Sequence, residues 1–325
     1  MNPRSTIDRR SLLAGAACML ALPGAWAQAQ KPLRLVAAGP AGATADAIAR
    51  LLAEELSKVL GRRVIVDPRA GGAGMIAVNE LLAAPADGST LLVGVNSLVS
   101  EIPHIVKVNR DMFREITPMA ELARGGLVLV GNPEVPAGNL KELVAYARQR
   151  PGQINYASYS AGTLSHVLGL LLNEAAGIQL VHVPYKGSTA AMTDVVAGHT
   201  QLMFDAMTTA LPMIRGGRVK AYAISTPERS PLLPDVPTFA ELGYSSLTAT
   251  GWMGLWCSGA MPADVQQPLL AAVRTAMASP SFGERLRTLG FDLGRSRTSG
   301  ELSKDLHADH ERVGRVLKAI GFKPE

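Results

Sequence analysis

The chain has 325 residues, of which 47% are hydrophobic and 18% are charged, and its formal net charge at neutral pH is +5. Its basic residues are scattered, without a run or a patch interleaved with aromatic residues, so we expect no nucleic-acid partner. About three hundred residues follow a predicted export signal. This length exceeds the usual size of one hydrophobic core and favours two lobes.

The first 27 residues form the predicted export signal. Arg9 and Arg10 precede leucines, an apolar run extends to about Leu22, and the small residues Ala25 and Ala27 suit a signal peptidase. The paired arginines favour the twin-arginine route over the general secretory route. The apolar run is shorter than the ~20 residues that a membrane-spanning helix needs. We therefore expect cleavage near Ala27 and a mature protein that is a soluble monomer in the periplasm.

The two cysteines bear on the state of the exported chain. Cys18 raises a lipoprotein alternative, but Gly15–Ala17 lacks the leucine expected three residues before a lipidated cysteine. If Cys18 is removed with the signal, Cys257 stands alone and cannot form an intrachain disulfide.

Beyond the signal, predicted strands alternate with predicted helices. The first series comprises a strand at 33–37, a helix at 46–60, a strand at 64–66, a glycine-rich turn at 71–74 with a helix ending at Leu82, and a strand at 91–93. The alternation implies parallel βαβ units. The apolar strands indicate a sheet that is covered on both faces.

A second series begins near Leu127. It comprises strands at 127–130, 154–157, 180–183, 202–204 and 219–224, helices at 140–150, 163–176 and 189–197, a proline-rich connection at 227–237, a strand at 252–257, and three helices ending near Ile320. The expected fold class is therefore α/β. Two doubly wound lobes, with a ligand between the carboxyl ends of their strands, are the natural architecture for this order.

Two polar loops stand where a predicted strand leads into a helix. They are 39–46 and 158–166, and each presents unpaired backbone N–H groups and the positive end of a helix dipole, which favour a bound anion. Neither loop contains Arg or Lys, so backbone groups and hydroxyls would hold a small mono- or dicarboxylate. No catalytic machinery is obvious beside either loop, which favours a receptor over an enzyme.

The candidate ligand-binding residues lie in these loops and after two further strands. They are Gly42, Ala43, Thr44, Asp46, Asn96, Ser97, Ser158, Ser160, Gly162, Thr163, Ser165, His166 and Asp205. Structural roles compete with ligand contact for several of them. Asp46 could cap its helix and pair with Arg50, and one Ser or Thr hydroxyl could cap the second helix. His166 could instead pack within the protein, and Asn96, Ser97 and Asp205 could instead form ordinary turns.

Five segments resemble those of one receptor family in their order and spacing. They are Gln153–Ser158, the Gly-Thr-x-Ser-His run that ends at His166, Val181–Ser188, Gln201–Asp205 and Arg229–Pro237. The chain from about 33 to 322 thus resembles the solute receptors of tripartite tricarboxylate transporters, also called Bug receptors. The resemblance implies a type II-like periplasmic-binding-protein fold with two crossings. Lobe one would be 31–128 plus 251–325, lobe two would be 129–250, and the strands near Val128 and Trp252 would form the hinge.

The resemblance also implies a function. In such receptors the loop that matches 39–46 holds a ligand carboxylate, and the acid that matches Asp46 lies close to the site. This chain departs from the family there, because Ala38–Ala41 replaces a proline–aromatic–proline segment and Gly42–Ala43 replaces a glycine pair. The mouth of the site should therefore be roomier or more polar. We expect a receptor that captures a small carboxylate and delivers it to membrane transporter subunits, with no cofactor and no metal.

Two other classes of function stay open at this point. Ser158–Gly162 is similar to the nucleophile elbow of α/β hydrolases with Ser for the first glycine, but its histidine would have to be His307 or His310 on a charged helix. The same two histidines have helical spacing for a metal but lack a third ligand. A sensory protein that serves a signalling partner would use the same cleft as a transport receptor, so the sequence does not separate sensing from transport.

Overall fold

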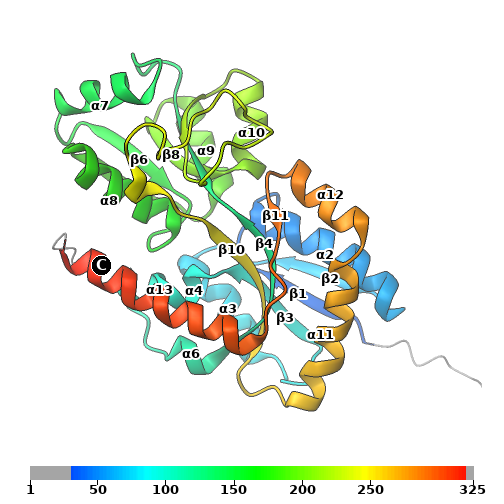
Figure 1. The fold of residues 1–325 in the computed structure, drawn as a ribbon. Helices are drawn as coiled ribbons and strands as arrows, with labels where there is room; N and C mark the ends of the chain where they lie inside the picture. Colours follow the sequence, from blue (N-terminus) through cyan, green and yellow to red (C-terminus); the bar gives the residue numbers. More distant parts are fainter. Residues whose placement is uncertain (1–30, 320–325) are drawn as a thin grey trace, which may run out of the picture. The chain divides into compact units, whose positions relative to one another are not determined.

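The computed structural model describes residues 31–319, and within this range the chain from Pro32 to Ala319 belongs to one compact unit. The predicted export signal at 1–27 lies outside the described residues. Two mixed β-sheets, each flanked by helices, make up the described chain (Figure 1). The two-lobed α/β architecture expected from the sequence is confirmed.

The larger sheet has six strands in the order β11-β4-β10-β3-β1-β2. These strands are β1 (Leu33–Ala37), β2 (Val64–Pro68), β3 (Thr90–Val95), β4 (Ile116–Gly125), β10 (Gly251–Ser258) and β11 (Asp292–Leu293). β1 pairs in parallel with β2 and β3, as the strand–helix alternation predicts. β10 runs antiparallel to β3 and β4. The sequence does not predict β4, because Pro118, Glu121 and Arg124 interrupt its apolar pattern.

Helices cover both faces of the larger sheet. α2 (Thr44–Leu60), α11 (Ala263–Met277) and α12 (Pro280–Thr288) pack on one face, and α3 (Met75–Ala83), α4 (Ser97–Ser100) and α13 (Ser299–Ala319) pack on the other. The neighbouring residues Leu35 and Val36 of β1 are both fully buried, each in a different core cluster, because successive side chains of a strand point to opposite faces. The short helices α5 (Ile102–Ile105) and α6 (Met112–Glu115) follow α4.

The smaller sheet has five strands in the order β7-β6-β8-β5-β9. Its strands are β5 (Leu127–Gly131), β6 (Ile154–Ser158), β7 (Leu180–Pro184), β8 (Leu202–Ala206) and β9 (Lys220–Ile224), and its helices are α7 (Leu140–Arg148), α8 (Leu164–Ala176), α9 (Ser188–Ala197) and α10 (Met207–Arg215). β6 is parallel to β7 and β8, whereas β5 is antiparallel to β8 and β9. The carboxyl ends of β6, β7 and β8 therefore lie at one edge of this sheet.

The chain crosses between the two sheets twice. It leaves the larger sheet at Gly126, the single residue between β4 and β5, and returns before β10. A Cβ at Gly126 would lie 2.8 Å from the Ser225 hydroxyl oxygen, so only glycine fits where the two crossing segments meet. Ser225 joins the segments, since its hydroxyl accepts a 2.9 Å bond from the Leu127 amide and donates a 2.8 Å bond to the Ala249 carbonyl. The crossings lie next to the residues where the sequence predicts the hinge.

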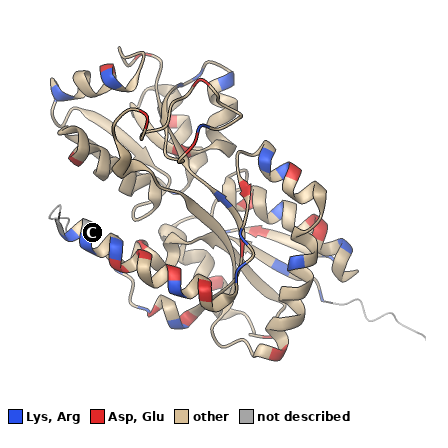
Figure 2. Ribbon diagram, viewed as in Figure 1, with Lys and Arg blue, Asp and Glu red and all other residues tan. Residues whose placement is uncertain are grey.

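Charged residues lie mainly on the outer helices. Along α13, Lys and Arg are interspersed with Asp and Glu (Figure 2), which agrees with the scattered charge of the sequence. Among residues 31–319, no helix combines the length and apolar character that crossing a membrane requires.

Candidate ligand-binding cleft

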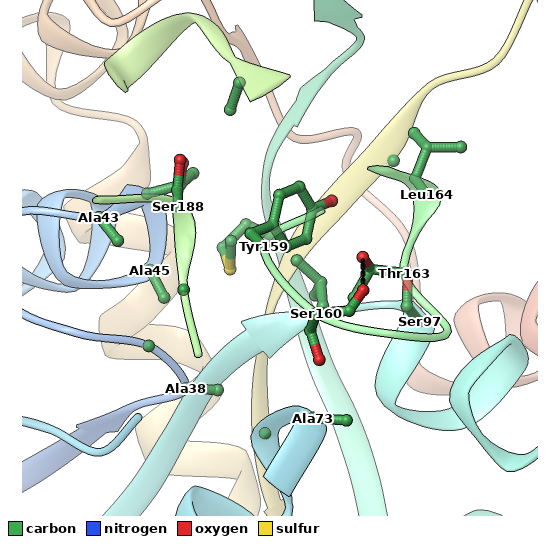
Figure 3. Close-up of a pocket in the computed structure, with 18 of the residues that line it drawn as sticks. Ala38, Ala43, Ala45, Ala73, Ser97, Tyr159, Ser160, Thr163, Leu164 and Ser188 are labelled. Atoms are coloured by element: carbon green, nitrogen blue, oxygen red, sulfur yellow. Dashed lines mark hydrogen bonds between the residues drawn. The ribbon is translucent and has the colours of Figure 1, made fainter. Parts of the chain in front are cut away.

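A cavity of about 130 Å³ lies between the two lobes (Figure 3). Its walls come from the segments that follow β1, β3, β6, β7 and β8, and from the start of β10. The carboxyl ends of parallel strands meet at the same edge of a sheet, which is where open α/β folds bind ligands. The cavity therefore occupies the place that the sequence predicts for the site.

Three helices of the two lobes begin at this cavity. The residues at the starts of α2, α8 and α9 that line it are Ala43, Thr44, Thr163, Leu164, Gly187 and Ser188. None of the three N-cap residues makes a side-chain capping hydrogen bond. The first N–H groups of a helix have no partner within it, and the helix dipole places partial positive charge there. One cavity thus has three positive helix ends at its wall.

The loop between β1 and α2 is held by Asp46. Asp46 is 3% exposed, and its Oδ2 accepts 2.9 Å hydrogen bonds from the Gly42 amide and the Arg50 Nε. Neither Asp46 nor Gly42 lines the cavity. The sequence left open whether Asp46 contacts the ligand or has a structural role. The structure gives it the structural role, with the pairing to Arg50 that the helical spacing predicts. Ala43 and Thr44 of the same loop do line the cavity.

In the loop between β6 and α8, too, some of the predicted ligand-binding residues line the cavity and others do not. Ser160 and Thr163 line the cavity, and the Thr163 hydroxyl donates a 2.7 Å bond to the Ser160 carbonyl. Ser158 and Ser165 do not line it. The Ser158 hydroxyl lies 2.6 Å from His182 Nε2, and the Ser165 hydroxyl donates to the carbonyl of Phe204. Both hydroxyls thus form hydrogen bonds within the lobe.

Gly162 and His166 also turn away from the cavity. The Gly162 amide donates a 3.2 Å bond to His166 Nδ1, which fixes the ring proton on Nε2 when the ring is neutral. Burial lowers the pKa of His166 to about 3 and that of His182, stacked on it, to about 4. Both rings are therefore neutral at physiological pH. For His166, the structure supports the packing alternative.

Asp205 lines the cavity at the end of β8 but is fully buried. Its carboxylate accepts a 2.5 Å bond from the Ser188 hydroxyl and a bond from the Thr209 hydroxyl. Burial raises the pKa of Asp205 to about 6, against the opposing effect of these bonds. Asp205 thereby ties the start of α9 to α10 within the smaller lobe.

Asn96 and Ser97 line the cavity from the larger lobe. Asn96 Oδ1 accepts a 3.0 Å bond from the Trp252 amide, which fixes the start of α4 against β10. The Ser97 hydroxyl donates to the carboxyl group of Glu101, one helical turn further on. Both predicted residues are thus at the cavity, and each is also part of the local hydrogen-bonding structure.

The structure adds residues that the sequence reasoning missed. Lys186 is the single cationic side chain among the described residues that line the cavity, and Tyr159, Tyr185 and Trp252 provide aromatic surface. A signal for Lys186 was present, because Val181–Ser188 also runs from a strand into a helix. The loop after β7 is thus a third loop of the same kind as those after β1 and β6.

The lobes touch at the edge of the cavity. Thr44 Oγ1 of α2 and Thr208 Oγ1 of α10 lie 2.7 Å apart. Gly187 has a φ of 125°, and a Cβ there would lie 2.5 Å from Pro40, so the loop after β7 approaches the loop after β1 as closely as glycine allows. These contacts bring the two lobes together at one edge of the cavity.

The structure does not assemble a hydrolase or metal site from the proposed residues. The Ser160 hydroxyl donates to the Ala161 carbonyl, whereas His307 and His310 stack on Phe113 and His104. Neither histidine lines the cavity. Within residues 31–319, no three His, Cys, Asp or Glu side chains gather in a way that could hold a metal ion.

Fold and cavity together define a two-lobed periplasmic binding protein. Residues 48–322 match the family described as "Tripartite tricarboxylate transporter family receptor", and the chain belongs to this family. A curated relative, the "UPF0065 protein in tcbD-tcbE intergenic region" of Pseudomonas sp. (strain P51), is 34% identical over 292 residues, which cover 88% of this chain and 87% of the relative. The Bug-type receptor family expected from the sequence is confirmed.

Solved structures agree with this assignment. The periplasmic binding protein BugD is similar with a TM-score of 0.85 at 29% identity, covering 91% of this chain and 99% of BugD. R. palustris Rpa4515 with adipate is similar with a TM-score of 0.86 at 27% identity, again covering 91% of this chain and 99% of the other. The chain is therefore a periplasmic solute-binding receptor. Its family and these neighbours are receptors and not enzymes, as the sequence favoured.

Proposed function

We propose that this receptor captures a small carboxylate between its lobes and delivers it to the membrane subunits of a tripartite tricarboxylate transporter. The observation that carries the proposal is the meeting of α2, α8 and α9 at one cavity, each by its N-terminus. Helix N-termini bind anions through free backbone N–H groups and the helix dipole. Lys186 adds one full positive charge at the same wall.

The size of the cavity supports a small solute. A cavity of about 150 Å³ accommodates a benzene ring, so the roughly similar volume here suits a compact acid rather than a peptide or a sugar chain. The relative Rpa4515 was solved with adipate, a dicarboxylate of this size class. Both observations favour a carboxylate with few carbon atoms.

The residue roles follow from the geometry. We assign solute contact to Ala43, Thr44, Asn96, Ser97, Ser160, Thr163, Asp205 and Lys186. In this assignment the other six sequence candidates hold the loops in place. We also assign the lobes to 31–128 plus 251–325 and to 129–250, with the two crossings joined by Ser225 as the hinge between them.

The binding claim is tested by thermal unfolding of the purified protein with a panel of acids and their methyl esters. An acid at about 100 times its Kd should add ~2.7 kcal/mol to the free energy of unfolding, which raises the Tm by a few degrees. The ester of the same compound should give little shift, because it lacks the negative charge that the helix ends attract. Equal shifts from an acid and its ester, or no shift from any acid, contradict the proposal.

Delivery requires a separate test in cells. Deleting the receptor should abolish uptake of the acid that binds most tightly, and restoring the receptor should restore uptake. Undiminished uptake, accompanied by loss of a transcriptional response to the acid, would instead establish the sensing alternative. The relatives are periplasmic binding proteins, which supports export through the predicted signal. Replacing Arg9 and Arg10 by Lys should block export by the twin-arginine route.

A further inference from the structure

A buried carboxyl group lies directly behind the cavity wall. Glu101 is 4% exposed, and its side chain accepts the hydroxyl proton of Ser97, which lines the cavity. No Lys or Arg of the described chain forms an ion pair with Glu101, and Arg312 pairs with Asp309 instead. An unpaired buried carboxylate is unfavourable, so this group needs a reason to be retained one hydrogen bond from the site.

The bond between Glu101 and Ser97 decides what Ser97 offers to a solute. A serine hydroxyl has one proton to donate and two lone pairs to accept with. When Glu101 is ionised, its carboxylate can only accept a hydrogen bond. Ser97 then donates its proton to Glu101 and presents only lone pairs to the cavity. When Glu101 is protonated, it can donate to Ser97, and the Ser97 proton becomes available to a solute.

The neighbouring hydroxyl group reinforces this effect. Thr163, at the start of α8, donates its proton to the Ser160 carbonyl. Thr163 and Ser97 both line the cavity, and the packing of Gly162 against Ile102 holds the loop before α8 close to the segment that follows α4. We call Ser97, Ser160 and Thr163 the hydroxyl end of the cavity; they are labelled in Figure 3. With Glu101 ionised, neither Ser97 nor Thr163 keeps a hydroxyl proton for a solute.

We propose, on the basis of the proposed carboxylate receptor, that Glu101 is a positioning residue that sets through Ser97 whether the hydroxyl end donates or accepts a hydrogen bond. The ionised form selects a solute that carries a hydroxyl at this end. The protonated form selects a solute that carries a second carboxylate there. Binding of a dicarboxylate is thus coupled to the uptake of one proton by Glu101.

The surroundings of Glu101 allow this change near neutral pH. Its pKa is raised to about 7, chiefly by burial; the Ser97 bond opposes the rise, the charge of Asp309 of α13 adds to it, and Arg312 of α13 opposes it. Tyr159 faces it from the smaller lobe and stays neutral, because burial and the Glu101 charge raise the tyrosine pKa. His310 of α13 binds the adjacent Ser100 carbonyl, and burial lowers its pKa. Within residues 31–319, no ion pair holds Glu101 in its ionised form.

The test compares two probes of equal chain length, adipate and 6-hydroxyhexanoate, by titration calorimetry at about pH 6 and about pH 8.5. When the pH is lowered from about 8.5 to about 6, the affinity ratio of adipate to 6-hydroxyhexanoate should rise roughly tenfold. This is the effect expected when the donor and acceptor of one hydrogen bond exchange roles. Measured in two buffers of different ionisation enthalpy near pH 7.5, adipate binding should take up about half a proton, because a tenfold effect corresponds to a shift of about one unit in the pKa of Glu101.

Variants isolate Glu101 from the other acid at the cavity. The amide of Glu101→Gln donates to Ser97 at every pH, so the part of the pH-dependent change in preference that Glu101 causes should be absent from this variant. Asp205 also titrates in this range, but it is unchanged in the variant and its effect cancels in the comparison. Glu55→Gln is the matched control, because Glu55 is a buried glutamate of α2 that bonds to Lys58 and Ser281 away from the cavity.

Several outcomes would overturn the inference. One is a probe preference that does not change with pH; another is the same change in Glu101→Gln as in the unmodified protein. If Glu101→Gln does not fold, Ser97→Ala serves instead, and retention of the full pH effect without the hydroxyl contradicts the inference. Failure of both probes to bind also contradicts it. The proposed function fails only if no acid of its own panel binds, so the two failures are distinguishable.

Discussion

Lys186 distinguishes the loop after β7 from the other two loops at the cavity. The loops after β1 and β6 contain no Lys or Arg, whereas the loop after β7 places one ammonium group at the cavity wall. In the proposed function, a bound carboxylate would therefore be attracted by the partial charges of three helix ends and by the full charge of Lys186. The charged side chain should add affinity without being the sole determinant of binding.

Lys186→Met tests that contribution. The variant keeps the apolar part of the side chain and removes the charge, so affinity for the preferred acid should fall about five- to tenfold, or about 1 kcal/mol for a partly exposed pair. The difference should shrink at high salt. Lys141→Met on α7 removes the same charge from an exposed position away from the cavity and is the control. Equal losses of affinity in both variants would mean that Lys186 acts through general electrostatic attraction and does not contact the solute.

Glu101 also predicts how stability depends on pH. Its pKa is raised from the ordinary value of 4.5 to about 7, so the folded protein holds more protons than the unfolded chain between these values. The contribution of Glu101 to the free energy of unfolding is therefore full below about pH 4.5 and is lost as the pH rises through 7.

Glu101→Gln should remove this loss, in an amount of about 1–3 kcal/mol between pH 4.5 and 8. His166 and His182 act in the opposite sense, since their lowered pKa values make stability rise as the pH increases toward 6.5. The comparison must therefore be variant against unmodified protein at each pH, by urea unfolding. Parallel stability curves would show that Glu101 is not the titrating group.

The sequence identified the polar loops but not which of their side chains line the cavity. Thr163 and Ser165 are two residues apart, yet the first lines the cavity and the second donates to Phe204 of β8. That outcome depends on the packing of α8 against a strand that lies 39 residues further along the chain. Residue types alone cannot decide it, because either hydroxyl suits both roles.

At the scale of elements, local signals were sufficient wherever a strand leads into a helix. Apolar strands followed by Gly, Ser and Thr located the ends of β1 and β6 and the starts of α2 and α8. The antiparallel strands were harder to place. β4 carries the buried Glu121, which pairs with Arg124 and Arg297 rather than continuing an apolar pattern, so only tertiary contacts reveal it as a sheet strand.

Gly162 lies where the loop before α8 packs against the other lobe. The sequence places Gly162 in a loop where its backbone could approach an anion, but the structure buries it with a φ of 79° against Ile102 of the other lobe. A Cβ there would lie 2.9 Å from the Ile102 Cα. Gly162→Ala should therefore hinder contact between the lobes and weaken solute binding about tenfold, or ~1.4 kcal/mol, by calorimetry.

Gly152 offers a matched control for this substitution. It has a φ of 72°, but a Cβ there would meet nothing within 4 Å. Gly152→Ala should lose about 1 kcal/mol of stability from the left-handed backbone alone, with no change in affinity. If Gly162→Ala binds the solute as well as Gly152→Ala does, the contact with Ile102 has no part in binding.

At the scale of the whole molecule, the alternation of strands and helices was enough to predict two lobes. The order of elements implies parallel units, and parallel units place their loops at one edge. The order of the strands and helices does not predict how the two lobes fit together. The contacts of Thr44 with Thr208 and of Pro40 with Gly187 join segments about 150 residues apart, and they lie at the edge of the cavity.

The central claim is that this cavity holds a small carboxylate, and the most direct measurement is native mass spectrometry of the receptor purified from the periplasm of its own cells. We expect a mature chain that begins near Gln28 with one small molecule bound in a one-to-one complex. Release by denaturation should identify that molecule as an organic acid with one or two carboxylates, of a size that suits a cavity of about 130 Å³. A neutral or cationic solute, bound in the same stoichiometry and displaced by none of the acids, would contradict the account.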